Sequence, residues 1–146
     1  MDLIEAIVTY YQTATDEATS ATRTLLEGSS AVLAPGQGKM FADYDEQTAT
    51  PPPYVAVSDH QGSRTLYVAF DNETRVDEYP IQFAVFAKTR TAVVEILDQL
   101  QAVYQNTQLQ TDDWVVIGAP YIELRRTFWG LDEWGGLLEL YFTCQS

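Results

Sequence analysis

The chain has 146 residues, of which 46% are hydrophobic, and its 8 Lys and Arg against 21 Asp and Glu give a formal net charge of −13. This length fits one domain over residues 1–146, and the apolar content excludes a disordered chain, which has too little apolar surface to offset its ordering entropy. Because an acidic chain repels phosphates, the charge argues against general binding of DNA or RNA.

The chain begins with a helical pattern. Apolar residues recur every three or four positions from Asp2 to Leu26, which predicts a single helix with one apolar stripe. The stripe consists of Leu3, Ile7, Tyr11, Ala14, Ala18, Ala21 and Leu25. Residues 29–53 follow with four prolines and two glycines, so we expect a long loop there.

Strand patterns follow the loop. Residues 54–57 and 64–70 are rich in β-branched and aromatic side chains, and the polar residues 59–63 between them predict a β-hairpin. Residues 79–87 are largely apolar on both faces, so we expect a central strand there.

The second half of the chain holds the clearest amphipathic pattern. Apolar residues repeat at helical spacing over residues 92–104, which predicts a helix that covers one face of the sheet. Strands are expected at residues 114–117, 122–128 and 137–144, with a glycine-rich turn at 129–136. The order predicts an α+β fold: a mostly antiparallel β-sheet with an N-terminal helix and a second amphipathic helix packed on it.

Two short motifs resemble ligand-binding loops without completing them. Gly36-Gln37-Gly38-Lys39 lacks the earlier glycine and the following hydroxyl residue of a phosphate-binding loop, whose places hold Leu33 and Met40. The acidic residues at 43–46 lack the glycine and the distal glutamate of a calcium loop. We therefore expect no cofactor and no metal ion.

Candidate catalytic residues are few. His60 is the single histidine, so any Ser–His or Cys–His pair depends on it, and it lies in a predicted turn with nothing to orient it. Cys144 is the single cysteine and lies on the predicted buried face of the last strand, where a thiol is usually inert. No spacing singles out a carboxylate pair. We expect no catalytic residue and a binding or assembly role rather than an enzyme.

Membrane association is not expected either. Residues 1–5 are acidic and amphipathic and lack the features of a signal peptide, and no apolar run reaches about 18 residues.

Aromatic residues at predicted surface positions are the candidates for contact with a partner. Phe128, Trp129, Leu131 and Trp134 lie around the predicted turn, and Tyr54 follows three prolines. Aromatic side chains are enriched where proteins anchor one another. The alternative is that these rings fold back over an open face of the sheet.

The layout of these elements resembles the small tail terminator, or tail-completion, proteins of long-tailed bacteriophages. The resemblance covers residues 54–146 and, more loosely, the first helix. It is carried by Pro53-Tyr54-Val55, by the strand at 81–87 that leads into the helix at 92–104, by Leu124-Arg125-Arg126 and by the final strand at 138–142.

This resemblance implies a structural virion protein, assembled in the host cytoplasm and located at the head-proximal end of the tail. It implies a hexameric ring that caps the tail tube, stops its polymerisation, contacts the tube protein and a neck or head-completion protein, and lets DNA pass without specific binding. Arg125 and Arg126 would then pair with acids across a subunit boundary; alternatively, Arg125 points to solvent beside Glu123. Two other readings stay open: a head–tail connector or other neck protein, and a small cytosolic enzyme or ligand-binding module.

Overall fold

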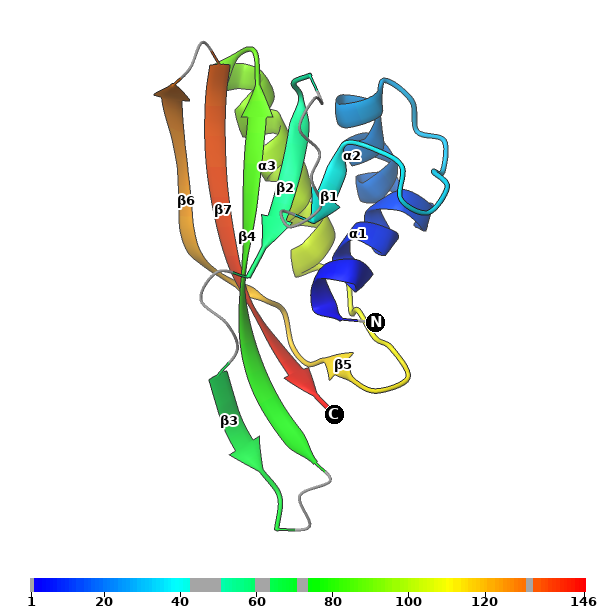
Figure 1. Cartoon of the computed structure of the whole chain (residues 1–146), viewed down its shortest axis with the longest axis vertical. Helices are drawn as coiled ribbons and strands as arrows, with labels where there is room; N and C mark the ends of the chain where they lie inside the picture. Colours follow the sequence, from blue (N-terminus) through cyan, green and yellow to red (C-terminus); the bar gives the residue numbers. More distant parts are fainter. Residues whose placement is uncertain (1, 43–50, 60–63, 71–73, 131–132) are drawn as a thin grey trace.

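The computed structural model describes residues 2–42, 51–59, 64–70, 74–130 and 133–146. Within these ranges, three helices and a mostly antiparallel seven-stranded sheet confirm the α+β prediction (Figure 1). The elements are α1 (Leu3–Thr13), α2 (Glu17–Glu27), β1 (Met40–Ala42), β2 (Tyr54–Ser58), β3 (Arg64–Val68), β4 (Arg75–Ala87), α3 (Arg90–Gln105), β5 (Val115–Val116), β6 (Tyr121–Gly130) and β7 (Glu133–Gln145).

The single N-terminal helix that the sequence predicts is in fact two helices. Ala14 is extended, and Asp16 caps the second helix by accepting hydrogen bonds from the backbone N–H and the hydroxyl of Thr19. Such a cap satisfies donors that the first turn of a helix leaves free. The break also turns α2, so its buried side chains differ from the predicted stripe. They are Thr19, Thr22, Arg23 and Leu26.

A buried arginine joins the two helices. Arg23 is 1% exposed, and it donates hydrogen bonds to the carbonyl oxygens of Tyr11 at 2.8 Å and of Ser30 at 3.0 Å. Glu27 accepts hydrogen bonds from the hydroxyl of Tyr11 and from the backbone N–H of Lys39. These polar contacts hold the segment after α2 against both helices.

The predicted loop at 29–53 is therefore wrong in part, because it contains strand β1. This strand pairs in parallel with β2, and its first residue, Met40, is fully buried. An apolar side chain at Met40 anchors the chain to the core, whereas the residues at 43–50 lie outside the described ranges.

The long strand β4 organises the sheet. It pairs with β7 along one edge over residues 76–87, and its other edge pairs with β3 through residues 75–78 and with β2 through residues 82–86. The predicted hairpin between β2 and β3 is wrong, because both strands use consecutive stretches of the same edge of β4. The prediction of a central strand is confirmed.

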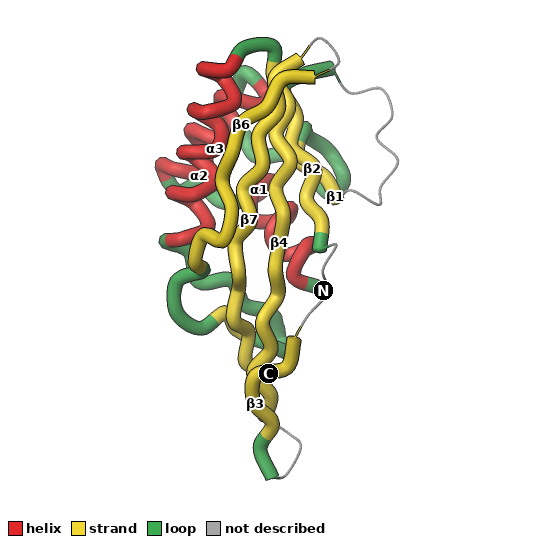
Figure 2. The backbone as a smooth tube through the Cα atoms, turned by 90° about the vertical axis from the view of Figure 1, so that its left-hand side faces the viewer, coloured by secondary structure: helices red, strands yellow, loops and turns green. Residues whose placement is uncertain are grey.

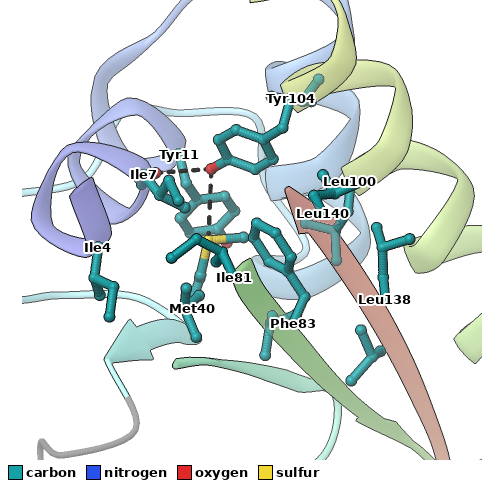
Figure 3. Close-up of a cluster of buried hydrophobic side chains, with 14 of the residues drawn as sticks. Ile4, Ile7, Tyr11, Met40, Ile81, Phe83, Leu100, Tyr104, Leu138 and Leu140 are labelled. Atoms are coloured by element: carbon teal, nitrogen blue, oxygen red, sulfur yellow. Dashed lines mark hydrogen bonds between the residues drawn. The ribbon is translucent and has the colours of Figure 1, made fainter. Parts of the chain in front are cut away.

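The core lies between the helices and one face of the sheet. Tyr104 of α3 stacks on Phe83 of β4 with ring centroids 5.2 Å apart, and its hydroxyl donates to the carbonyl oxygen of Ile7 at 2.7 Å (Figure 3). The predicted helix is confirmed, and the apolar residues that repeat at three and four positions are buried: Val93, Ile96, Leu97, Leu100, Val103 and Tyr104. Gly136 of β7 lets α3 approach closely, because a Cβ there would lie 2.6 Å from Val93.

The helices cover the sheet incompletely. Figure 2 shows them gathered on one side, and β3 with the first residues of β4 extends beyond them at the lower end of Figure 1. In the described part of the chain, no helix has the length and apolar character needed to cross a lipid bilayer. In the part of the chain that the structure describes, no helix therefore covers the other face of the sheet or its lower end.

Candidate assembly interface

The uncovered face of the sheet carries a continuous row of aromatic rings. Phe41 of β1 stacks on Tyr54 of β2 at 5.8 Å between ring centroids, and Tyr54 stacks on Phe86 of β4 at 5.0 Å. Phe86 meets Phe128 of β6 edge to face at 6.2 Å. We call these four residues the aromatic stripe. Pairs of this geometry contribute beyond the area that they bury.

The stripe crosses β7 at a glycine. Gly135 lies in register between Phe86 and Phe128, and a Cβ at that position would lie 2.3 Å from Cζ of Phe128. The ring of Phe128 therefore lies over the glycine and reaches Phe86 across it. The absence of a side chain at position 135 is what allows rings from β4 and β6 to meet.

Two of the predicted contact residues, Tyr54 and Phe128, belong to the stripe. The predicted turn at 129–136 is wrong, because Trp129 continues β6 and Trp134 belongs to β7. These two tryptophans form a cross-strand pair with centroids 5.3 Å apart, and Trp129 is 57% exposed. Cross-strand aromatic pairs stabilise a hairpin, which explains why the strands extend this far. Leu131 lies outside the described residues.

The alternative prediction for the aromatic residues holds for Phe128, whose ring folds back over the open face of the sheet. It does not hold for Trp129, which alternates to the other side of β6 from Phe128. The sequence could not distinguish these outcomes, because the register of β6 on β7 decides which ring points to which face.

Arg125 forms its contacts within the chain. Its guanidinium donates to the carboxylate of Asp98 and to the side-chain oxygen of Gln101 at 2.8 Å, both on α3. Within the chain, Arg125 therefore pairs with α3 and does not simply point to solvent, whereas its pairing across a subunit boundary stays a prediction. Arg126 lies opposite Leu137 in register, and among the described residues no hydrogen bond or ion pair involves it.

A polar group interrupts the apolar surface near the middle of the uncovered face. The hydroxyl of Tyr121 on β6 donates to Glu78 of β4 at 3.1 Å, and Arg64 of β3 pairs with the same carboxylate at 3.1 Å. Tyr121 also packs on Tyr141 of β7, with ring centroids 5.0 Å apart. Desolvation, together with neighbouring carboxylates, raises the pKa of both tyrosines, so their hydroxyls stay protonated.

Strand β3 forms a second uncovered surface. All five of its residues are exposed, and the apolar ones are Leu66, Tyr67 and Val68; Phe70 just beyond it is fully exposed. Sequence analysis predicted this strand but did not identify it as a contact surface. The available signal was a run of adjacent apolar residues, which alternation on a half-buried strand would not produce.

The described residues offer little for catalysis. Burial raises the pKa of the Cys144 thiol to about 12, so it is neither ionised nor accessible, and its predicted burial is confirmed. His60 lies outside the described ranges. In those ranges no group of three His, Cys, Asp or Glu side chains could hold a metal ion.

A partly open cavity lies beside the start of α1. Its volume is about 300 Å³, and it is lined by Leu3, Tyr79, Trp114 and Cys144 together with three aspartates. Among the described residues that line it, no paired acid and base could carry out a reaction, so the uncovered surfaces remain the stronger candidates for function.

A scan against protein-family models finds none that matches this chain, and a search of curated proteins finds no match.

Proposed function

We propose that this chain is a structural virion protein of a long-tailed bacteriophage: a tail terminator that forms a ring, caps the tail tube, stops its polymerisation and joins the tail to the head or neck. The observation that carries this proposal is the pair of uncovered apolar surfaces at separate places on one sheet. A closed ring requires heterologous contacts, in which one patch of a subunit meets a different patch of its neighbour.

The exposed surfaces favour assembly over binding of a small molecule. Monomeric proteins rarely leave large apolar patches in contact with water, and a strand with a free edge invites pairing with another chain. Phe128 is 37% exposed, the other stripe residues are half-buried and β3 is exposed throughout, whereas small-molecule sites are concave and bury most of the ligand. Burial against other protein subunits accounts for both surfaces at once.

The order of the elements supports the tail assignment. Strand β4 leads into α3 through only Lys88 and Thr89, and β7 returns beside β4 as the last strand. This succession underlies the resemblance to tail terminators. The proposed partners are further copies of the chain in a hexameric ring, the tail tube protein, and a neck or head-completion protein.

The net charge of −13 fits a ring through which DNA passes. An acidic inner wall repels phosphates, so DNA would slide through the lumen without specific binding. The same repulsion acts between copies, which means that the ring contacts must be apolar or must pair basic residues with acidic ones.

The deciding experiment is electron microscopy of particles made when the gene is disrupted, with the wild-type gene supplied in trans as control. Tails that grow too long and carry no heads would support a terminator. Tails of normal length beside filled heads would favour a connector or other neck protein. Normal virions would contradict any role in assembly and would favour an enzyme or a ligand-binding module.

A further inference from the structure

We propose that β3 of one copy packs on the uncovered sheet face of a second copy, over Leu124 of β6 and Leu137 of β7. The proposal rests on the ring-forming part of the proposed function and names the contact that builds the ring. It assigns the projecting strand as the donor surface and this part of the uncovered face as the receiving surface.

A second copy is required because β3 lies too far from Leu124 and Leu137 of its own chain. Tyr67 of β3 lies opposite Val76 of β4, whereas Leu137 lies opposite Ala84, eight residues further along β4. At about 3.3 Å per residue these positions are about 26 Å apart along one continuous strand. The projecting strand therefore points away from the body, and its apolar side chains are available to another molecule.

The charges of the two surfaces are complementary. Arg64 is the single charged residue of β3, and Arg75 begins the adjacent β4. Each pairs with an acid of β4, Glu78 and Asp77, but the arginine side chains are 72% and 50% exposed and the acidic ones only 10% and 16%, so the charge that this surface exposes is mainly basic. The described part of β6 and β7 that forms the receiving surface carries Glu123, which is exposed, and Glu133, which is half-buried, against one basic residue on that face, Arg126; Glu139 on the same face is buried.

Electrostatics therefore favours this contact over other contacts between copies. In a chain of net charge −13, most surfaces of two copies would repel each other. A basic, apolar strand on an acidic, apolar face avoids this repulsion and fixes the orientation of the neighbour. The donor and receiving surfaces differ, so the contact is head-to-tail, and each copy can use both surfaces once.

The test uses one substitution on each surface. Tyr67→Glu places a carboxylate on the donor strand, and Leu124→Arg places a cation on the receiving surface. Both side chains are exposed, so the thermal unfolding midpoint of each variant should stay near that of the wild type. Val32→Glu is the matched control, because Val32 and Tyr67 are both 56% exposed.

Assembly is followed by sedimentation or mass photometry over a range of concentrations. We expect Tyr67→Glu and Leu124→Arg each to raise the concentration needed for assembly by about tenfold or more, and Val32→Glu to leave it unchanged. An equimolar mixture of the two variants still has one intact donor and one intact receiver. It should form one-to-one heterodimers that do not grow.

A mixture that stays monomeric, or a Tyr67→Glu variant that assembles like the wild type, would overturn the proposed contact and leave the ring itself standing. A wild-type chain that stays monomeric at every concentration would overturn the contact and the free ring together. The tail-length experiment would then still decide the role in the tail.

Discussion

The ring of Phe128 lies against the backbone of Gly135 on the neighbouring strand, where a Cβ would come within 2.3 Å of Cζ. Through this contact the ring reaches Phe86 on the strand beyond, 6.2 Å away between centroids. The aromatic row across the uncovered face thus depends on one position that has no side chain.

Gly135→Ala should consequently destabilise the chain by about 1–3 kcal/mol, because an added methyl group must displace the Phe128 ring. Gly130→Ala is the control, since nothing lies within 4 Å of a Cβ at that position. Chemical denaturation of both variants measures the difference. If the steric contact is the cause, Gly135→Ala should cost much less in a Phe128→Ala background; an unchanged cost would contradict this explanation.

The two adjacent arginines of β6, Arg125 and Arg126, should contribute differently to the free energy of unfolding. Arg125→Ala removes the contacts with Asp98 and Gln101 on α3 and should lower the free energy of unfolding by about 0.5–1 kcal/mol. Arg126→Ala, for which no partner is described, should change it by less than about 0.5 kcal/mol. A double-mutant cycle between Arg125→Ala and Asp98→Ala checks the coupling. Zero coupling would show that the ion pair contributes nothing.

The thiol of Cys144 should react slowly. It is buried, and its raised pKa of about 12 keeps it protonated at neutral pH. Modification by a thiol reagent at pH 8 should proceed at the rate at which the chain opens, and it should become fast in denaturant. Rapid modification of the native chain would contradict the burial of this side chain.

Alkaline pH should destabilise the fold, because the buried thiol of Cys144 and the buried hydroxyl of Tyr104 resist losing their protons in the folded chain. Burial raises the pKa of Cys144 from 9.0 to about 12 and also raises that of Tyr104, so the unfolded chain releases protons that the folded chain retains. Their contribution to stability is complete below about pH 9 and is lost progressively above it. Denaturation curves between pH 7 and pH 11 measure this loss.

Tyr104→Phe separates two effects of that hydroxyl. At neutral pH the variant should be less stable by about 1 kcal/mol, because the hydrogen bond to Ile7 is lost and a buried carbonyl oxygen stays unpaired. Above pH 10 its stability should fall less steeply than that of the wild type. Tyr67→Phe on exposed β3 is the control and should leave both quantities unchanged.

The sequence predicted the elements whose periodicity is strong and local. Helix α3 and the strands β4 and β7 bury one face each, and their apolar residues repeat at the matching spacing. The break before α2 was missed because Asp16 lies within a continuous helical pattern, where its role as a cap is not distinguished from that of a solvent-facing acid. Local patterns therefore predict the presence and type of a helix or strand better than the residues at which it begins and ends.

Contacts between distant residues could not be predicted in this way. β2 and β3 share an edge of β4 because that strand is 13 residues long. The residues between β2 and β3 do not indicate this shared pairing. Arg125 meets Asp98 only once β6 lies beside α3. In the candidate interface, the aromatic residues at 54 and 128 were identified, but their connection through Phe86 and Gly135 depends on strand register. The exposure of β3 depends on where the helices end.

The projecting end of the sheet is a continuation of its two longest strands, since β4 and β7 stay paired over residues 76–87 of β4. It is therefore a stiff arm and cannot swing like a loop. Paired strands twist with a fixed hand. The angle at which β3 meets a neighbour would follow from that twist, and the number of copies that closes a circle would be set by the shape of a single strand pair.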